Sequence, residues 1–301
     1  MASRDDDGDS APLTGAVAAM LARELAGPPA PGLHIVATPI GNLADISLRA
    51  LAVLARADHI LCEDTRHSQK LLTAYAIRGR LSPYHDHNAA GQRPKILGWL
   101  ADGASVALIS DAGTPLIADP GYKLVRAALE AGHTVHAVPG PSAAIAALSV
   151  SGLPTDAFHF AGFLPPKQAA RRRRLEELAD VAATLVLYET APRLSQTLQD
   201  LAAAMSGREV VIAREITKRF EELIRGVLPL SLPGDAADLK GEIVILIAPP
   251  EEREHAGDEI RETLVQALQR LSLRDAVDEV TRTLRVPRRT VYALALELQK
   301  V

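Results

Sequence analysis

Short runs rich in β-branched residues alternate with longer Ala- and Leu-rich segments along most of this 301-residue chain, beginning at Leu33. The short runs have the length of buried strands, and the longer segments repeat apolar residues at helical spacing. Parallel strands need long crossover connections, so this alternation predicts an α/β fold built from βα units around a largely parallel sheet. We expect strands at residues 34–37, 59–62, 106–109 and 135–138, and helices at residues 48–55, 70–75, 95–100, 123–130 and 143–149.

A Gly- and Pro-containing break at residues 151–154 predicts a domain boundary. An N-terminal α/β domain is therefore expected over residues 32–152 and a C-terminal α/β domain over residues 153–250. Strands of the second domain are expected at residues 185–188, 210–214, 221–225 and 243–247. The last three have no room for long helices between them, which predicts antiparallel pairing in a mixed sheet.

The two ends of the chain differ from this pattern. Residues 1–31 mix Asp, Gly, Ala and Pro, a composition that predicts a disordered arm with at most a short helix around residues 17–25. After Pro249 and Pro250 a charged helical tail is expected over residues 257–301. Apolar residues recur there at helical spacing in two groups, Leu273, Ala276, Val277 and Val280, then Val291, Leu294, Ala295 and Leu298. The tail therefore resembles a helix-turn-helix extension, with a turn at Val286 and Pro287.

Composition narrows the class of protein. The single cysteine, Cys62, cannot form an intramolecular disulfide, and the acidic N-terminus does not match a signal peptide. No apolar run approaches the roughly 18 residues of a membrane span. These features predict a cytoplasmic protein that does not bind a membrane. The net charge of -4 further predicts that any contact with RNA comes from local basic patches.

Three Gly- and Pro-containing loops each follow a predicted strand, at residues 38–42, 110–115 and 139–143. Ligands of open α/β sheets bind beyond the carboxyl ends of the strands, so these loops should meet at one small-molecule site. Gly41, Gly113 and Gly140 would let the backbone approach the ligand closely. One such loop alone would more often be a simple turn, but three after successive strands favour a site.

The loop chemistry indicates which ligand the site takes. The chain contains neither the P-loop nor the dinucleotide-binding glycine pattern. Asp111 and Asp119 place carboxylates beside the second loop, which disfavours a phosphate and suits a cation. S-adenosylmethionine has a sulfonium, an amino group and no phosphate, so it fits this loop better than NAD or ATP.

Several strings, taken in order, closely resemble one family: VATPIGNLADISLRAL, EDTRHS, YHDHN, SDAGTPLIADPG, PGPSA, GFLP, YETAPR and KGEIVILI. They resemble the small-subunit ribosomal RNA methyltransferases of the tetrapyrrole (corrin/porphyrin) methylase superfamily. The resemblance covers about residues 33–248, and residues 259–300 are similar to the family's C-terminal helix-turn-helix extension. It implies two α/β domains with S-adenosylmethionine in the cleft between them, a homodimer, and 2′-O-methylation of a cytidine in 16S ribosomal RNA of the small ribosomal subunit.

The same resemblance implies a set of cofactor contacts on the loops and on the second domain. They are Pro39, Gly41, Asn42, Asp111, Gly113, Thr114, Ile117, Ala118, Pro139, Gly140, Ser142, Tyr188, Glu189, Ala213 and Gly241. Ala118 departs from the family, which often has Ser at this position, so the resemblance does not imply a side-chain contact there.

The predicted catalytic residues follow a strand at the ligand-bearing edge of the sheet. Glu63, Asp64 and Arg66 would supply a base and a phosphate contact, and Asp64 is the preferred base. A carboxylate in such a place is otherwise a helix cap or an ion-pair partner. Lys218 is a further candidate for positioning a phosphate or hydroxyl. His85 and His87 alone are too few ligands for zinc, so no metal is expected.

Two basic clusters predict RNA contact, although a charge run is usually a solvated face. Arg171, Arg172, Arg173 and Arg174 precede an amphipathic helix, and Arg282, Arg285, Arg288 and Arg289 lie at the turn of the tail. Two other functions remain open, a tetrapyrrole C-methyltransferase and a noncatalytic RNA-binding assembly factor. The basic clusters argue against the first, and the intact loops argue against the second.

Overall fold

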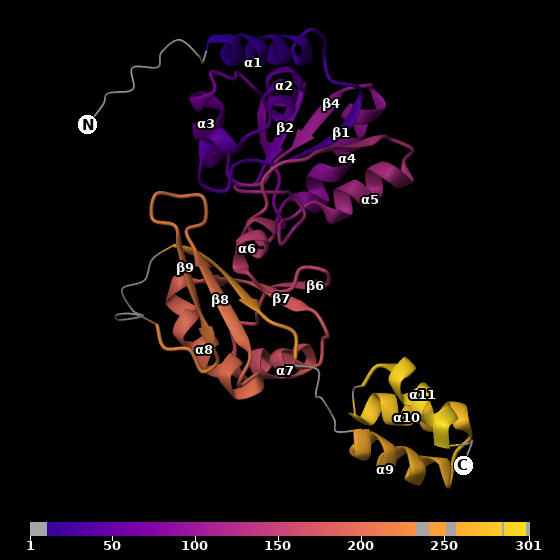
Figure 1. Cartoon of the computed structure of the whole chain (residues 1–301). Helices are drawn as coiled ribbons and strands as arrows, with labels where there is room; N and C mark the ends of the chain where they lie inside the picture. Colours follow the sequence, from indigo (N-terminus) through magenta and orange to yellow (C-terminus); the bar gives the residue numbers. More distant parts are fainter. Residues whose placement is uncertain (1–10, 233–240, 251–256, 285, 299–301) are drawn as a thin grey trace. The chain divides into compact units, whose positions relative to one another are not determined.

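The computed structural model of the protein describes residues 11–232, 241–250, 257–284 and 286–298. The chain forms two compact units, Met1–Ala248 and Pro249–Val301. The first unit contains two five-stranded sheets with helices packed against them, and the second unit is helical (Figure 1).

The first sheet is parallel throughout, with the strand order β3-β2-β4-β1-β5. Its strands are β1 (Gly32–Val36), β2 (His59–Cys62), β3 (Leu81–Pro83), β4 (Ser105–Leu108) and β5 (Val135–Val138). The connecting segments are η1 (Leu43–Asp45), α2 (Leu48–Arg56), α3 (Thr65–Ala74), α4 (Ala89–Ala101) and α5 (Tyr122–Glu130). The prediction of parallel βα units is confirmed. Strand β3 was not predicted, because its three residues are too few to show a period.

The second sheet is mixed, with the strand order β6-β7-β10-β8-β9. Its strands are β6 (Phe158–Phe163), β7 (Thr184–Thr190), β8 (Glu209–Arg214), β9 (Glu222–Val227) and β10 (Glu242–Ile247). Strands β6 and β7 are parallel and are joined through α7 (Gln168–Ala179), and α8 (Ala191–Ala204) follows β7. The other pairs are antiparallel, which confirms the pairing predicted for the last three strands.

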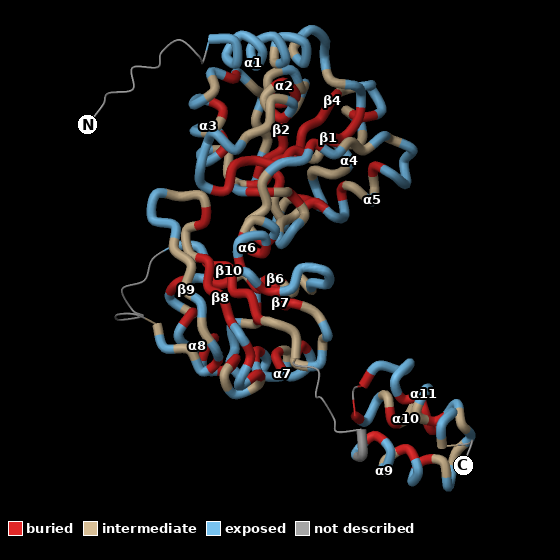
Figure 2. The backbone as a smooth tube through the Cα atoms, in the orientation of Figure 1, coloured by how far each residue is buried: buried red, intermediate tan, exposed pale blue. Residues whose placement is uncertain are grey.

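Helix α6 (Ala143–Ser151) joins the two sheets. It follows β5 of the first sheet, but its buried Ala144, Ala147 and Leu148 pack against Val186 and Val211 of the second sheet. Figure 2 shows the buried strands of both sheets in red, with exposed residues on the outer helices. The boundary expected at residues 151–154 thus follows a helix that already belongs to the packing of the second sheet.

The N-terminal segment differs from the prediction. Residues expected to be disordered form helix α1 (Ala11–Glu24), which is longer than the short helix expected at residues 17–25. The segment is rich in Ala, the residue of highest helix propensity. Helix α1 buries none of its residues but lies against α2, and Arg56 of α2 donates a hydrogen bond to the carbonyl of Leu25 at 2.9 Å. Residues 1–10 of the predicted arm lie outside the described residues.

The described part of the second unit contains α9 (Gly257–Leu268), α10 (Leu273–Leu284) and α11 (Arg288–Leu298). The two predicted apolar groups pack together in one core, to which α9 adds Ile260, Leu264 and Ala267. The two apolar groups correspond to α10 and α11, whereas no bounds were predicted for α9 within the helical tail. Within the described ranges, no helix is long and apolar enough to cross a membrane.

Candidate active site

The three predicted loops meet at the carboxyl ends of the first sheet. Thr38 and Gly113 exchange backbone hydrogen bonds of 2.9 and 3.0 Å, forming a short antiparallel bridge between the first and second loops. The Thr114 hydroxyl donates to the carbonyl of Pro141 at 3.0 Å, which ties the second loop to the third. The convergence inferred from the order of strands and loops is therefore confirmed.

A cavity of about 300 Å³, here called the first cavity, lies between these loops and the second sheet. Many of the residues predicted to bind the cofactor line it. They are Asp111, Gly113, Thr114, Ile117, Ala118, Ser142, Tyr188 and Glu189. The remaining lining residues are Ile40, Ala112, Asp119, Ala143, Phe163, Thr190, Ile216, Glu242, Ile243 and Val244.

The second cavity, of about 310 Å³, adjoins the first. Its lining includes the predicted Pro39, Gly41 and Lys218, together with the basic side chains of His67 and Lys70. Four residues line both cavities, namely Ile40, Asp111, Ala112 and Glu242. The two cavities thus share a wall, and Asp111 and Glu242 are carboxylates in that wall.

Five predicted cofactor residues lie near these cavities without lining them. Asn42 caps η1 by accepting a hydrogen bond from Ala44 N at 3.0 Å. Pro139 and Gly140 belong to the third loop, and Ala213 is buried in the second sheet. Gly241 has φ +106° and packs against Glu215, so a Cβ at this position would lie 2.4 Å from Glu215 Oε1.

The second loop and the residues just after it include several residues in the left-handed region. Gly113 has φ +82°, Leu116 has φ +73° and Ala118 has φ +64°. A Cβ on Gly113 would also lie 3.2 Å from Ile40 Cγ2, another residue of the cavity wall. Non-glycine residues adopt this conformation at an energetic cost, and such residues cluster at ligand sites.

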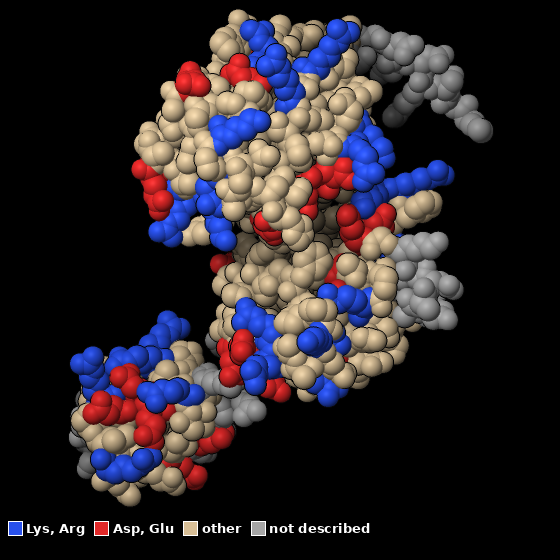
Figure 3. All heavy atoms as spheres, turned by 180° about the vertical axis from the view of Figure 1, so that it is seen from behind, with Lys and Arg blue, Asp and Glu red and all other residues tan. Residues whose placement is uncertain are grey.

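Carboxylates concentrate negative charge at the first cavity. Burial, together with the charges of Glu63 and Asp111, raises the pKa of Asp119 to about 6. A hydrogen bond from Ser110 lowers this pKa but does not offset the rise. Partial burial and the charges of Asp111 and Asp86 also raise the pKa of Glu63. In Figure 3, Asp and Glu gather around the hollow between the two halves of the first unit. A cationic ligand in the first cavity would relieve this repulsion.

An aromatic cluster forms the wall opposite the loops. The ring of Tyr188 makes edge contacts with Phe160 and Phe163, with centroid distances of 4.9 and 5.6 Å. Its hydroxyl accepts a hydrogen bond from Ala144 N at 3.3 Å. Burial raises the pKa of Tyr188, so the phenol stays neutral and offers a polar tip on an apolar face.

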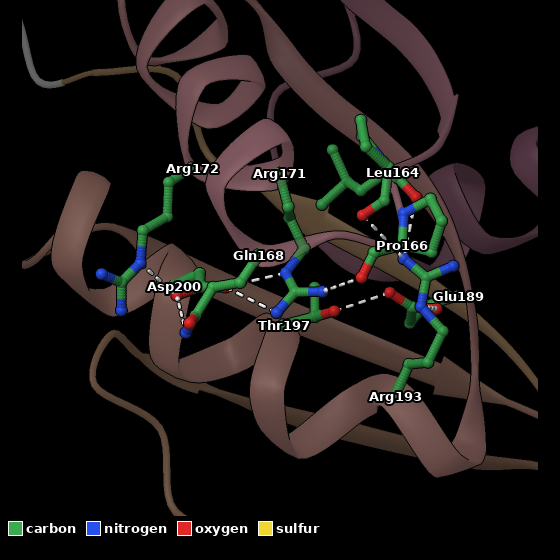
Figure 4. A network of polar contacts seen from close by, with 10 residues as sticks. Leu164, Pro166, Gln168, Arg171, Arg172, Glu189, Arg193, Thr197 and Asp200 are labelled. Atoms are coloured by element: carbon green, nitrogen blue, oxygen red, sulfur yellow. Dashed lines mark hydrogen bonds and ion pairs between the residues drawn. The ribbon is translucent and has the colours of Figure 1, made fainter.

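Glu189 anchors the same wall through a buried network (Figure 4). Its carboxylate accepts a hydrogen bond of 2.6 Å from the Thr197 hydroxyl and lies 3.3 Å from Arg193 Nε. Arg193 Nη2 in turn donates to the carbonyl of Leu164 at 2.8 Å, immediately after Phe163. Through Arg193, Glu189 thereby holds the chain immediately after Phe163, the last residue of β6, which lines the first cavity.

The predicted catalytic segment lies beside the cavities rather than in their walls. Asp64 is the N-cap of α3, and its carboxylate accepts from Arg66 N at 2.8 Å and from the Arg66 guanidinium at 3.3 Å. These hydrogen bonds lower the pKa of Asp64. Asp64 N donates to Asp111 Oδ1 at 3.2 Å, which links the segment to the shared wall. Glu63 and Arg66 are exposed, and neither lines the first or the second cavity.

Lys218 is held by two carboxylates. Its Nζ lies 2.8 Å from Glu215 Oε1 and 2.9 Å from Glu242 Oε2. Burial by itself lowers the pKa of Lys218, but the hydrogen bonds to the two carboxylates outweigh it, and the pKa lies above its ordinary value. The side chain therefore stays cationic and can position an anion or a hydroxyl.

The structure corrects part of the predicted RNA-binding set. Arg171 is buried and paired with Asp200, so its guanidinium cannot contact a phosphate at the surface (Figure 4). Arg172 also bonds Asp200 but keeps a half-exposed side chain, and Arg174 pairs with Glu177. Arg173 is exposed.

The tail's predicted basic residues differ in their contacts. Arg282, Arg288 and Arg289 are all exposed, and Arg288 also pairs with Asp278 at 2.7 Å. Arg285 lies outside the described residues.

Sequence reasoning missed part of the wall that lies opposite the loops. Phe163, Thr190, Ile216 and Ile243 carry no loop signal, although Phe163, Thr190 and Ile243 lie within strings that resemble the family. Asp119 also lines the first cavity, although it does not belong to the predicted set of cofactor contacts. Among the described residues no group of three or more His, Cys, Asp or Glu side chains is arranged to hold a metal, and His85 and His87 pack edge to face at 5.9 Å.

Comparison with known proteins defines the class. The family model described as Tetrapyrrole (Corrin/Porphyrin) Methylases matches residues 32–230, and the chain belongs to this family. A second model, described as the RsmI C-terminal HTH domain, matches residues 254–299. Methylases of this family use S-adenosylmethionine, and the chain is an S-adenosylmethionine-dependent methyltransferase.

Curated relatives over most of the chain are named ribosomal RNA small subunit methyltransferase I. The relative from Mesorhizobium japonicum is 48% identical and the alignment covers 89% of this chain and 92% of that protein. The relative from Vibrio cholerae is 44% identical, with 89% and 95% covered. Uroporphyrin-III-C-methyltransferase from Thermus thermophilus shares the fold at 24% identity, with a TM-score of 0.53 over 72% of this chain and 93% of that chain.

Proposed function

We propose that the protein methylates the 2′-hydroxyl of a cytidine ribose in 16S ribosomal RNA, acting on the small ribosomal subunit in the cytoplasm as a homodimer. The observation that carries the proposal is the shared wall between an acidic, aromatic cavity and a neighbouring cavity with basic side chains. Methyl transfer needs donor and acceptor in contact, and adjoining cavities provide that arrangement. The names of the curated relatives support ribosomal RNA as the substrate.

The first cavity suits S-adenosylmethionine. Asp119 and Asp111 offer carboxylates to the cofactor's cationic groups, and Gly113 leaves room for close approach of the backbone. Tyr188, Phe163 and Ile243 supply an apolar surface for the adenine ring. The bound cofactor supplies an electrophilic methyl group.

The second cavity suits the target nucleotide. Lys218 is a fixed cation in its wall, and Lys70 and His67 add basic side chains that can face an RNA phosphate. Arg66, with its side chain 89% exposed, stands outside this cavity where a neighbouring phosphate can reach it. We assign further phosphate contacts to the exposed Arg173 and Arg289.

The proton of the ribose hydroxyl needs an acceptor at the shared wall. Asp111 and Glu242 line both cavities, but Glu242 is bonded to Lys218. We therefore assign the acceptor role to Asp111. The 2′-oxygen forms a bond to the methyl carbon as the carbon–sulfur bond breaks, and its proton passes to the Asp111 carboxylate. Asp64 and Glu63 then flank the base, with the Asp64 amide holding Asp111 in place.

Small subunits purified from cells that lack this protein provide the test. Incubation with the protein and S-adenosylmethionine should add one 2′-O-methyl mark at a cytidine of 16S ribosomal RNA, detected by mass spectrometry of nuclease fragments. Methylation of a uroporphyrinogen-type tetrapyrrole with no mark on the subunit would reject the proposal in favour of the tetrapyrrole alternative. Binding of the subunit without methylation of either substrate would favour the assembly factor.

A further inference from the structure

The turn between β8 and β9 presents an aromatic side chain to solvent. Phe220 is 67% exposed, and the guanidinium of Arg219 lies 5.5 Å from the centroid of its ring. Burial of a phenylalanine is normally favourable, so an exposed ring paired with a cation forms a surface suited to a planar ligand. We call Arg219 and Phe220 the hairpin tip.

The backbone under the hairpin tip is held by several contacts. Lys218 N donates to Glu215 O at 2.9 Å, and Glu221 N donates to Lys218 O at 3.1 Å. Thr217 N donates to the Glu221 carboxylate at 2.6 Å. Glu215 and Thr217 have φ +50° and +66°, an unfavourable conformation for residues other than glycine. The turn is thus fixed in a costly shape, which displays the tip in one direction.

The same turn reaches the second cavity. Lys218 precedes the tip and lines that cavity with Gly41, which packs so closely that a Cβ would lie 2.4 Å from Lys218 Cγ. In Figure 1 the loop joining β8 and β9 extends from the second sheet toward the loops of the first sheet. A ligand chain that reaches Lys218 in the second cavity therefore comes close to Phe220, which is two residues further along this turn.

We propose that the hairpin tip binds the RNA nucleotide next to the target, with Phe220 stacked on its base and Arg219 at its phosphate. The inference rests on the proposed RNA substrate. When the target nucleotide flips out of the base stack to enter the second cavity, its neighbour loses a stacking partner. An aromatic ring beside the cavity replaces that partner, and stacking of this kind accepts any base. The tip thus contributes to binding of the strand rather than to the choice of base.

Substitutions at Phe220 separate stacking from general apolar contact. Phe220→Ala and Phe220→Leu should each raise the KM for small subunits about tenfold or more, with kcat and S-adenosylmethionine affinity within about twofold of the parent. Phe220→Trp keeps a stacking surface and should leave the KM near that of the parent. The matched control is Phe158→Ala on β6, because Phe158 is 45% exposed and lines neither cavity.

The proposed contact between Arg219 and a phosphate is tested separately. Arg219→Gln should weaken RNA binding and reduce the slope of log affinity against log salt by about one, as expected for loss of one phosphate contact. Light scattering on every variant reports the number of copies in solution, and calorimetry with S-adenosylmethionine reports the cofactor cavity.

Each contrary outcome has a distinct meaning. If the parent methylates subunits and the KM is unchanged in Phe220→Ala and Phe220→Leu, the role proposed for the hairpin tip is overturned. The proposed function of the protein is then unaffected. If Leu preserves the KM while Ala lowers the number of associated copies, the tip is an interface between copies of the chain. Loss of cofactor binding in Phe220→Ala also overturns the proposal, because Phe220 would then act through the first cavity. A parent that methylates no subunit rejects the proposed function itself.

Discussion

Arg171 and Asp200 form a buried ion pair between α7 and α8, with 2.7 Å between Nη2 and Oδ2 and side chains that are 1% and 0% exposed. Arg172 and Gln168 complete the hydrogen bonding of the same carboxylate (Figure 4). Arg171 also donates to the carbonyl of Pro166 at 3.3 Å, in the loop that follows Phe163. Arg171 belongs to a basic run in the sequence, but in the structure it holds α7 against α8 in the second half of the first unit.

Removal of the carboxylate should be costly. Asp200→Ala leaves the Arg171 charge buried without its partner, so the free energy of unfolding should fall by about 3–5 kcal/mol. Urea denaturation followed by circular dichroism measures the change. The control is Glu177→Ala, which removes the partner of Arg174 at the surface and should cost about 1 kcal/mol or less. A loss below about 1 kcal/mol in Asp200→Ala would contradict a structural role for this pair.

Gly113→Val should abolish binding of S-adenosylmethionine. The substitution places a branched side chain where φ is +82°. Its Cβ alone would lie 3.2 Å from Ile40 Cγ2 in the cavity wall. Isothermal calorimetry measures the affinity. Gly103→Val is the matched control, because Gly103 has the same φ of +82°, a Cβ there would meet no atom within 4 Å, and the residue lines neither cavity. Normal cofactor binding by Gly113→Val would remove the second loop from the site.

Cofactor affinity should depend on pH through Asp119. The pKa of Asp119 in the free protein is about 6, and a bound cation favours the ionised carboxylate, so affinity should increase as pH rises through 6. If the cation returns the pKa to about 4, binding at pH 5 should be about tenfold weaker than at pH 7.5. Asp119→Asn should flatten this dependence in calorimetric titrations. A flat profile in the parent would show that Asp119 does not face the cofactor's charge.

The stability of the protein without ligand should depend on pH in the opposite direction to cofactor affinity. A carboxyl whose pKa is raised on folding favours the protonated native state, so its contribution to stability is present at low pH and is lost as pH rises through about 6. Asp119→Asn should consequently raise the Tm of the unliganded protein at pH 7.5 and change it little at pH 4. Differential scanning calorimetry at both values checks the sign independently of the cofactor.

The sequence predicted the half of the site that is built from local signals. Gly113 and its loop were found because glycine and proline follow a strand, and topology alone brings such loops together. Ile243 escaped prediction because β10 is apolar on both faces, and such a strand does not reveal which face meets a cavity. Ile216 escaped because it lies in the turn after β8, where no sequence pattern marks it. Arg171 was misassigned because its partner Asp200 lies 29 residues away, and a run of arginines by itself resembles a solvated face.

The tail should contribute to RNA binding without affecting the cofactor. The second unit buries its own core, so deletion of residues 257–301 leaves the first cavity intact. Filter binding of small subunits at increasing salt should show weaker affinity and a shallower salt slope, while calorimetry with S-adenosylmethionine is unchanged. Arg289→Gln should weaken binding more than Arg288→Gln, because Arg288 is already paired with Asp278. Equal subunit affinity across salt for the truncated and full chains would exclude the tail from RNA contact.

The identity of the base can be decided by two isosteric substitutions. Asp64→Asn keeps an N-cap acceptor for Arg66 N and keeps the backbone amide that bonds Asp111, and the lowered pKa of Asp64 makes its carboxylate a poor proton acceptor. Turnover should therefore stay within a few-fold of the parent. Asp111→Asn retains the shape of the shared wall but removes the proposed acceptor, so the methylation rate should fall by about 10² or more.

Single-turnover methylation at saturating S-adenosylmethionine isolates the chemical step from the weaker cofactor binding that Asp111→Asn also causes. A 10²-fold loss in Asp64→Asn together with a near-normal rate in Asp111→Asn would instead assign the proton to Asp64. In that case the cap of α3 would have to release its carboxylate from Arg66 when RNA binds, because in the structure that carboxylate is bonded to the Arg66 amide and guanidinium.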